Sequence, residues 1–252
     1  MPPVRSNPEV ERQLEVIRSG VEELIPEEEL VRKLERSLQT RTPLRIKQGF
    51  DPTAPDIHLG HTIGLRKLRQ FQELGHQVVL IVGSYTALVG DPSGRSQTRP
   101  TISEEQVNAN ARTYLDQFFK VVDKARTEVR WNGEWFQPMS FLDILRLTSR
   151  FTVARILERD DFSIRFKSGE PISVHELLYP LMQAYDSVVI RSDVEIGATE
   201  QKFNLLCGRY IQAAYDVEPQ VILTLPVLEG LDGVRRMSKS LGNYIGIAEP
   251  PK

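Results

Sequence analysis

The chain has 252 residues, of which 40% are hydrophobic and 26% charged, and its formal net charge is −2 at pH 7. These fractions are typical of a folded globular protein and exclude an intrinsically disordered chain, which would have fewer apolar residues and a larger net charge. The near-neutral balance also excludes a protein that holds nucleic acid by overall positive charge. A polyanionic partner would have to meet a local basic patch.

The single cysteine, Cys207, excludes an intrachain disulfide framework and fits a reducing compartment. Its apolar neighbours favour a buried hydrophobic residue over a nucleophile. The longest apolar run, 78–82, is far shorter than the roughly 20 residues of a membrane span. The N-terminus lacks the apolar segment of a secretory signal. We therefore expect a cytoplasmic protein that has no contact with a membrane.

Apolar residues at helical spacing predict a helical N-terminal stretch over 8–39, with a helix restarting after Pro26. The next three elements are a strand at 44–50, a helix at 59–74 and a strand at 77–82 that reads as buried on both faces. Together they form a βαβ unit, which implies a right-handed parallel crossover.

Later segments continue this alternation. Ser103 and Gln106 form a capping box for a helix that runs to about Lys120. Further elements are predicted in chain order as helices at 140–149, 152–159, 173–190 and 199–214 and a strand at 220–225. The fold class is therefore α/β, with an open parallel sheet and N-terminal helices.

Three parts follow from this pattern. We expect an N-terminal helical segment at 1–40, an α/β domain at 41–225 with a helical insertion at about 136–190, and a mobile loop and linker at 226–252. Ligands of open α/β sheets bind beyond the carboxyl ends of the strands, so the loops that follow the strands are the places to look for chemistry.

The loop after the first long strand leads directly into a helix and carries His58 and His61. Residues three apart on a helix face the same way. Gly60 between them leaves the backbone bare, and a helix N-terminus favours anions. This arrangement indicates a site for the ribose and phosphates of a nucleotide. Metal binding by the paired histidines and a structural role for both are the alternatives.

Two further loops carry candidate groups. Asp91 lies at the mouth of the sheet after 77–82, and Arg95 and Arg99 follow as candidate phosphate partners. Asp-Pro-Ser-Gly is also ordinary turn chemistry. The segment 235–243 is a glycine-bounded cationic loop that can close over a polyphosphate. Taken alone, such a basic loop is usually solvated surface.

At this point the sequence resembles a known family. His58-Leu59-Gly60-His61 resembles the HIGH signature and Arg236-Met237-Ser238-Lys239-Ser240 resembles the KMSKS signature of class I aminoacyl-tRNA synthetases. The ordered segments GFDPTAPDIHLGH, GDPSGRS, LLYPLMQAYDSV, EQKFN and MSKSLGNYIGI are similar to bacterial tyrosyl-tRNA synthetases over about 30–252. The resemblance implies a Rossmann-like catalytic domain, with 226–252 as the mobile signature loop and a truncated linker.

The resemblance also implies a reaction and its partners. Tyrosine would attack the α-phosphate of ATP, which comes with Mg²⁺, to give tyrosyl-adenylate and pyrophosphate. The tyrosyl group would then pass to tRNA(Tyr) in the full-length enzyme. The family is homodimeric, and it needs no protein nucleophile, no tightly bound cofactor and no metal ligands from the protein for the first step.

Residue roles are implied by matching motifs. The residues implied in catalysis are Thr53, His58, His61, Arg95, Arg99, Arg236 and Lys239. Those implied in tyrosine binding are Asp91, Tyr179, Gln183, Asp186, Gln201 and Thr86. Those implied in ATP binding are Gly49, Asp51, Gly60, Ala198, Glu200, Leu228, Met237 and Lys239.

One part of this set has independent support from spacing. Tyr179, Gln183 and Asp186 fall at i, i+4 and i+7, so they share one helical face. The alternative for that face is a core stripe with a buried polar network. In the family pattern, Asp186 accepts the phenolic hydroxyl, while Asp91, Tyr179 and Gln183 hold the α-ammonium group.

Several positions depart from the family pattern: Lys47 for a frequent tyrosine, Ser84 for aspartate, Ala87 and Ala198 for glycine, Glu200 for aspartate, and Arg236 for lysine. The family's full enzyme also continues past this chain into tRNA-binding regions. These features keep other hypotheses open: a non-catalytic synthetase-like module that binds tyrosine or RNA, an engineered or altered-specificity variant, and a nucleotidyltransferase with a different acceptor.

Overall fold

The computed structural model describes residues 7–53, 56–91, 102–238 and 241–249. One six-stranded sheet runs through the molecule in the order β1-β6-β5-β2-β3-β4, and neighbouring strands pair in parallel except β1 with β6. The strands are β1 (Glu23–Ile25), β2 (Arg45–Phe50), β3 (Gln77–Val82), β4 (Thr127–Trp131), β5 (Val194–Ala198) and β6 (Val221–Leu225). The predicted α/β class with an open, mainly parallel sheet is confirmed.

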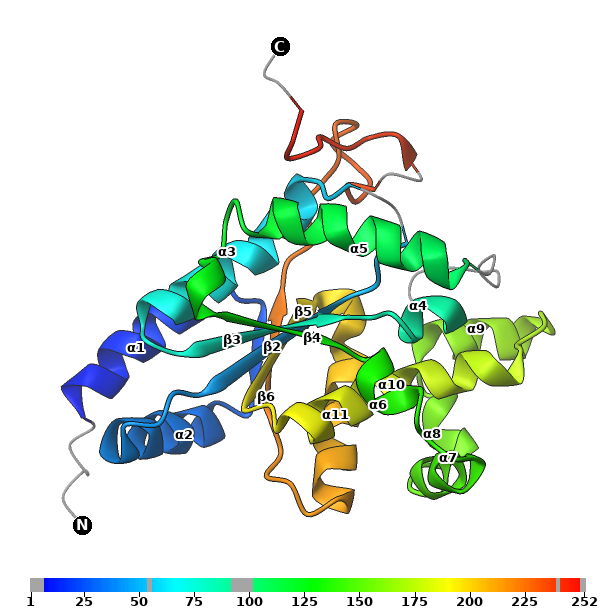
Figure 1. Cartoon of the computed structure of the whole chain (residues 1–252), viewed down its shortest axis with the longest axis horizontal. Helices are drawn as coiled ribbons and strands as arrows, with labels where there is room; N and C mark the ends of the chain where they lie inside the picture. The colour runs from blue at the N-terminus through cyan, green and yellow to red at the C-terminus, as the bar shows by residue number, and fades with distance from the viewer. Residues whose placement is uncertain (1–6, 54–55, 92–101, 239–240, 250–252) are drawn as a thin grey trace.

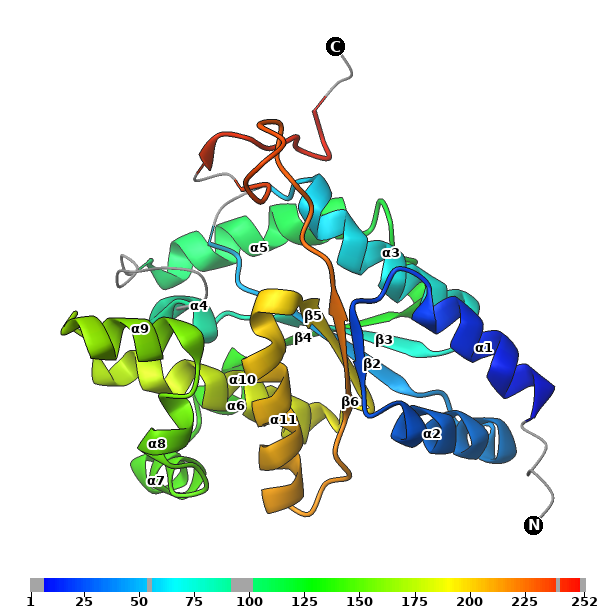
Figure 2. The same cartoon turned by 180° about the vertical axis from the view of Figure 1, so that it is seen from behind.

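Helices cover both faces of this sheet (Figures 1 and 2). One side carries α1 (Pro8–Arg18), α3 (Leu59–Glu73) and α5 (Glu104–Phe118), while α2 (Glu27–Thr40) packs beside β6. The opposite side carries α6 (Gly133–Phe136), α10 (Tyr179–Ile190) and α11 (Lys202–Ala214). The remaining short elements are α4 (Thr86–Val89), η1 (Lys124–Arg126), α7 (Phe141–Thr148), α8 (Val153–Ile156), α9 (Asp160–Ser168), η2 (Val174–Leu178) and η3 (Thr199–Gln201).

Strand β3 shows how the core divides between the two faces. Val78 and Leu80 belong to the cluster under α1, α3 and α5, whereas Val79 and Ile81 pack against α6 and α10. Successive side chains of a strand point to opposite faces, so a continuous apolar run is what a strand covered on both sides requires. The bounds predicted for this strand, 77–82, are those observed.

The N-terminal stretch differs from its prediction. It is broken by the three-residue strand β1, which pairs antiparallel with β6, so the expectation of a purely helical prefix over 8–39 was wrong. The helix after Pro26 is confirmed as α2. Val10, Leu14 and Leu30 are fully buried in the main core, so this prefix completes the sheet edge and its covering layer.

Besides β1, two longer strands were not predicted, β4 and β5. Strand β4 alternates charged and apolar residues and is half-buried along its length, and β5 contains Glu195 and Gly197. The capping box predicted at Ser103 is half formed: Ser103 Oγ accepts from the Gln106 amide at 3.2 Å, but the Gln106 side chain donates to Asn110.

The strand order creates one switch point. From β2 the chain proceeds outward through β3 and β4, then returns to place β5 on the other side of β2 and β6 beyond it. Crevices at the carboxyl ends of strands beside such a reversal are where open α/β sheets bind ligands. In the described part of the chain, no helix is both long and apolar enough to cross a membrane.

Candidate active site

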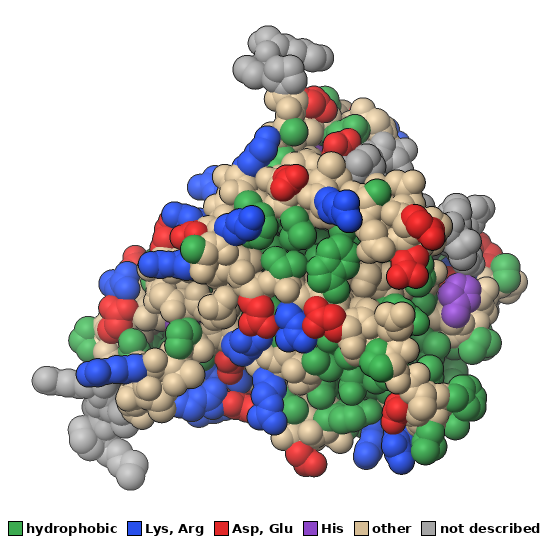
Figure 3. All heavy atoms as spheres, in the orientation of Figure 1, with side chains coloured by type: hydrophobic (Ala, Val, Ile, Leu, Met, Phe, Trp, Pro, Cys, Tyr) green, Lys and Arg blue, Asp and Glu red, His purple; other side chains and the backbone are tan. Residues whose placement is uncertain are grey.

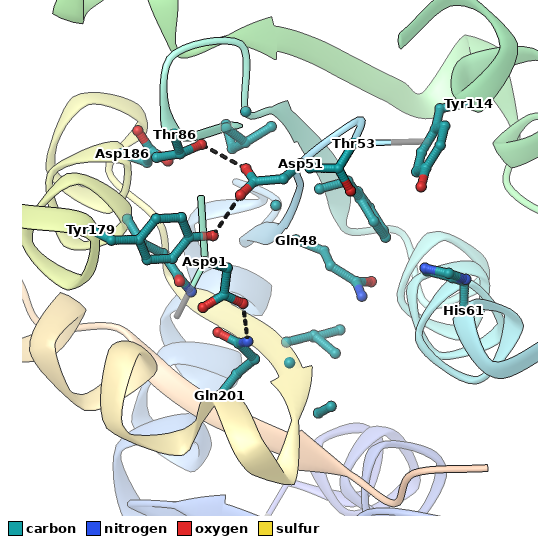
Figure 4. Close-up of a pocket in the computed structure, with 18 residues that line it drawn as sticks. Gln48, Asp51, Thr53, His61, Thr86, Asp91, Tyr114, Tyr179, Asp186 and Gln201 are labelled. Carbon is teal, nitrogen blue, oxygen red and sulfur yellow. Dashed lines mark hydrogen bonds between the residues drawn. The ribbon is translucent and has the colours of Figure 1, made fainter. Parts of the chain in front are cut away.

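A cavity of about 310 Å³ opens at the carboxyl ends of β2, β3 and β5, at this switch point (Figure 4). It brings together residues predicted from distant parts of the sequence: Gly49, Asp51, Thr53, His61, Thr86, Asp91, Tyr179, Gln183, Asp186, Ala198 and Gln201. Gln48, Phe50, Ile81, Gly83, Tyr114, Ile196 and Gly197 complete the lining. Asp186 and His61 lie on opposite sides of this cavity.

The helix start at one end of the cavity is built by the two histidines. His58 is the N-cap of α3, and its Nδ1 accepts from the Gly60 amide, while His61 Nδ1 accepts from the His58 amide, each at 3.2 Å. The two ring centroids lie 4.0 Å apart, and the ring planes are tilted by 56° to each other. Because each Nδ1 is an acceptor, the proton of the neutral ring resides on Nε2, which makes that atom a hydrogen-bond donor.

Gly60 has a different immediate role from the one predicted. A Cβ at this position would lie 2.9 Å from His58 Nδ1 and Cε1, so the absent side chain makes room for the capping ring. The sequence argument placed a flat ligand group against this glycine. In the structure the group packed there is the imidazole of His58, so Gly60 has a structural role at the helix start.

The wall between β2 and α10 is organised around Asp51. The Tyr179 hydroxyl donates to Asp51 Oδ2 at 2.8 Å, and Thr86 Oγ1 donates to Asp51 Oδ1 at 2.7 Å. A Cβ on Gly83 would lie 2.0 Å from Asp51 Oδ1, so glycine is required where these side chains meet. Asp51, predicted for ATP binding, therefore contacts two residues predicted for tyrosine binding.

Asp186 forms the buried end of the cavity. Trp135 Nε1 donates to its Oδ1 at 2.9 Å, and Asn132 Nδ2 lies 3.5 Å from its Oδ2. Burial raises the pKa of Asp186 from its ordinary value of 3.8 to about 7, against the opposing effects of the Lys47 charge and these hydrogen bonds. A buried carboxylate with an unfilled acceptor capacity suits a ligand hydroxyl that donates to it.

A second carboxylate, Asp91, lies at the more open side. Gln201 Nε2 donates to Asp91 Oδ2 at 2.7 Å, and Arg159 Nη2 lies 3.4 Å from Asp91 Oδ1. Gln183 comes from α10 and lines the same cavity. The three groups predicted to hold an α-ammonium, Asp91, Tyr179 and Gln183, thus line a single cavity.

Lys47 lies beneath the site and does not line it. Its ammonium group donates to the Gln183 carbonyl at 2.8 Å and to Ser187 Oγ at 2.7 Å, and it pairs with Glu195 Oε1 at 2.9 Å. The Lys47 and Glu195 side chains are 0% and 1% exposed. All three ammonium protons are therefore used inside the protein. At this position, where the family pattern often has a tyrosine, the structure has a buried ion pair.

The signature loop returns to the helix start of α3. Met237 is buried, its amide donates to the Leu228 carbonyl at 2.7 Å, and its Cβ approaches the position that a Cβ of Gly60 would occupy. Arg236 forms an ion pair with Glu200, which follows β5. Three predicted catalytic residues, Arg95, Arg99 and Lys239, lie outside the described residues.

Sequence reasoning missed several side chains that shape the site: Asn132, Trp135, Arg159, Glu195 and Asn204. Asn132 and Trp135 follow β4, and Glu195 lies on β5. Because neither β4 nor β5 was predicted, the sequence analysis did not consider the loop after β4 or the side chains of β5. The sequence signal that could have revealed Asn132 was its position in Trp131-Asn132-Gly133, at the end of a possible strand.

No group of three or more potential metal-ligating side chains occurs within the described ranges.

Comparison with known proteins identifies the family to which this fold and sequence correspond. The sequence matches the family described as tRNA synthetases class I (W and Y) over residues 39–252. The chain belongs to this family. In the described part of the chain, the HIGH-like segment and Met237 of the KMSKS-like segment, far apart in sequence, lie together at the start of α3.

Relatives within the class I synthetases carry a specific name. The tyrosine--tRNA ligase of Carboxydothermus hydrogenoformans is 57% identical over 244 residues, which is 97% of this chain and 59% of the relative. That of Nitratidesulfovibrio vulgaris is 60% identical over 243 residues, 96% of this chain and 60% of the relative. The chain thus spans about three fifths of the length of the curated relatives it matches.

Solved structures of class I synthetases share the fold. The crystal structure of tyrosyl-tRNA synthetase complexed with L-tyrosine from Archaeoglobus fulgidus matches with a TM-score of 0.77 at 26% identity, covering 96% of this chain and 71% of that chain. The enzyme from Aeropyrum pernix also gives 0.77, at 19% identity over 96% of this chain and 69% of its own. The second likeness supports the Rossmann-type fold alone.

Proposed function

We propose that this chain activates tyrosine with ATP, giving tyrosyl-adenylate and pyrophosphate. The observation that carries the proposal is a single cavity with the buried carboxylate of Asp186 at one end and the histidine-capped N-terminus of α3 at the other. One end suits an amino acid with a hydroxyl, and the other suits phosphates. The relatives named tyrosine--tRNA ligase and the archaeal complex with L-tyrosine support the same substrate.

At the amino-acid end, Asp186 accepts the phenolic hydroxyl of tyrosine. A buried site built to bond a hydroxyl rejects the analogue that lacks it by about 10⁴–10⁵-fold, since the polar group is then left without its partner. The α-ammonium group has three N–H donors, and the acceptors nearest the cavity mouth are Asp91 and Gln183. Gln201 and Thr86 fix the two carboxylates of this end, Asp91 and Asp51.

At the nucleotide end, the N-terminus of α3 and the Nε2–H groups of His58 and His61 attract the phosphates of ATP. Gly60 and Met237 lie at this helix start, and Thr53 lines the same cavity. Gly49 and Ala198 line the cavity at the ends of β2 and β5, where the ribose would pass, and Glu200 follows β5. Leu228 anchors the signature loop through Met237.

The chemistry at this site needs positioning more than protein acid–base groups. A carboxylate oxygen of tyrosine forms a bond to the α-phosphorus of ATP, and the bond to the pyrophosphate leaving group breaks. Donors that face the leaving group as its negative charge grows stabilise this transition state. Arg236 and Lys239 of the loop, with Arg95 and Arg99, supply cations for that purpose.

The same proposal extends to the other partners. Mg²⁺ enters with ATP as part of the substrate, because phosphate oxygens are its preferred ligands. In the full-length enzyme the tyrosyl group passes to tRNA(Tyr), and we propose that the protein acts in the cytoplasm. The tRNA step draws on regions that the longer relatives have in addition to the part matched here.

We also propose that the chain forms a homodimer through the segment around α7 and α8. Phe141 is 74% exposed, Leu145 48% and Val153 60%. Hydrophobic side chains gather at the lower right of Figure 3, where Figure 1 places these helices. Contiguous apolar patches of this kind mark association surfaces. Phe151 and Ile156 pack inward instead.

The decisive experiment is tyrosine-dependent exchange of labelled pyrophosphate into ATP. We expect exchange by the wild-type chain, and a loss of at least about 100-fold in Lys239→Ala with tyrosine affinity nearly unchanged, as for a group that acts mainly in the transition state. Lys120→Ala, an exposed cation on another loop, is the matched control. Tyrosine binding without any exchange would instead identify a non-catalytic binding module.

A further inference from the structure

Asn204, near the start of α11, lies at the centre of a buried amide network behind the candidate site. Its side chain is 1% exposed. Its Nδ2 donates to Gln183 Oε1 and to Gln201 Oε1, both at 3.0 Å. Its Oδ1 accepts from Arg159 Nη1 at 3.2 Å. Both amide hydrogens of Asn204 are therefore used, each on a residue that lines the cavity.

This geometry fixes the orientation of two glutamine amides. An amide nitrogen only donates, so the atoms of Gln183 and Gln201 that face Asn204 must be oxygens. On their other sides, Gln201 Nε2 donates to Asp91 Oδ2, and Gln183 Nε2 donates to Glu195 Oε1 at 3.1 Å. If either glutamine amide were rotated by 180°, its nitrogen would face the Asn204 nitrogen and its oxygen would face a carboxylate oxygen. Neither contact is a hydrogen bond, so only one orientation of each amide is possible.

Arg159 fixes the orientation of Asn204 in turn. A guanidinium group only donates, so the Asn204 atom that faces it must be the oxygen. The Arg159 side chain is 3% exposed, and it also contacts Asp91 Oδ1 at 3.4 Å. Arg159 therefore sets the Asn204 amide and supports the negative charge of Asp91 at the same time.

We propose that Asn204 and Arg159 are positioning residues for the α-ammonium group of the amino-acid substrate. They hold Asp91 and Gln183 so that an ammonium ion with three N–H donors meets a carboxylate and an amide oxygen, not an amide N–H. Neither residue lines the cavity, so both act through the groups that do. The inference rests on the proposed tyrosine activation and adds to it the residues that prepare the amine-binding end.

A buried asparagine can also serve only the packing of a helix, and α11 offers a matched comparison. Gln212 lies on the same helix, is 0% exposed, and makes three hydrogen bonds: its amide donates to the Ser187 and Ser192 carbonyls and accepts from the Gln220 amide. None of these bonds involves a residue of the cavity lining. Gln212→Ala therefore measures the effect of losing a buried amide in this layer without touching the site.

The test measures tyrosine affinity by calorimetry without ATP. Asn204→Asp keeps the shape and the acceptor for Arg159, but it replaces the two donated hydrogens by a second carboxylate oxygen that faces Gln183 Oε1 and Gln201 Oε1 and adds a negative charge. We expect it to weaken tyrosine binding by about tenfold or more, the effect of one or more lost hydrogen bonds near a charged group. Arg159→Lys, which keeps the charge but loses the forked contact, is expected to act in the same direction. Gln212→Ala should leave the affinity within about twofold.

A second readout separates positioning from general loosening. The ratio of kcat/KM for tyrosine over phenylalanine in the exchange reaction depends on Asp186, so Asn204→Asp should leave that ratio unchanged while raising KM for tyrosine and not for ATP. Wild-type affinity in Asn204→Asp, an equal loss in Gln212→Ala, or a parallel fall in the tyrosine-to-phenylalanine ratio would overturn the inference. If the wild-type chain itself binds no tyrosine, the proposed function fails with it.

Discussion

At the scale of single residues, Asp186 shows what spacing alone can and cannot reveal. The i, i+4, i+7 pattern of Tyr179, Gln183 and Asp186 predicts a shared polar face, and all three line one cavity. The partners that define the chemistry of Asp186, Trp135 and Asn132, lie more than 50 residues earlier in the chain. Periodicity within one helix carries no information about a loop that follows another strand, so these partners required the tertiary structure.

The raised pKa of Asp186 predicts a pH dependence of stability. Between about pH 4 and pH 7 the folded chain holds a proton on this carboxyl that the unfolded chain has lost. Because the folded state then binds more protons, the free energy of unfolding falls as the pH rises through this window. We expect Asp186→Asn to remove this part of the slope, measured by urea unfolding at several pH values without ligand.

The matched control for this experiment is Asp56→Asn, which changes an exposed carboxylate outside the cavity. It should keep the wild-type slope. If Asp186→Asn and wild type show the same dependence on pH, the buried carboxyl is not the group that titrates.

At the scale of secondary-structure elements, the predicted bounds were accurate where the hydrophobic pattern was not interrupted by buried charges. The run Gln77–Val82 is apolar on both faces and was predicted with its observed bounds, and the helix at 59–74 differs from α3 by one residue. Strands β4 and β5 were missed because they carry charges, and the buried Glu195 of β5 pairs with Lys47 from β2. An ion pair between strands has no signature in local sequence.

The start of α3 allows a prediction about one element. Gly60→Ala places a methyl group 2.9 Å from the His58 ring and displaces it, so the cap should be lost at a cost of about 1 kcal/mol. In a His58→Ala background the same methyl group meets nothing closer than Met237 Cβ at 3.8 Å. We therefore expect the two substitutions to be non-additive in urea unfolding, with little further cost in the double variant. Additive effects would show that Gly60 does not serve the cap.

At the scale of the whole molecule, the sheet separates two layers of helices with different tasks. The layer of α1, α3 and α5 packs into the largest core cluster and presents the helix start to the nucleotide end of the cavity. In the opposite layer, helix α10 has two differently used faces. Asp186 lines the cavity, while Leu181 and Ala184 pack against α11 and Leu147 of α7. The outer face of α7 remains apolar and exposed in the single chain.

The exposed apolar face of α7 predicts a homodimer, and charged substitutions in this face should dissociate it. Phe141→Asp with Leu145→Asp places two charges in the exposed apolar face and should convert a dimer to a monomer, measured by sedimentation at micromolar concentration. Val234→Asp, an equally exposed apolar position in the loop after β6, serves as the control and should remain dimeric. A wild-type chain that sediments as a monomer, or a double variant that stays dimeric, would contradict the proposed interface.

The short pairing between β2 and β5 has a mechanical consequence. These strands share only two residue pairs, Ile46 with Val194 and Lys47 with Glu195, whereas β2 and β3 share six. Beyond that seam the strands splay apart, and the cavity occupies the fork. The sheet thus has two parts, β1-β6-β5 and β2-β3-β4, that are joined by few backbone hydrogen bonds. A ligand bound in the cavity contacts both strands and should stabilise the connection between the two parts. Occupancy is expected to slow amide hydrogen exchange along both strands, including at their first residues, which do not line the cavity.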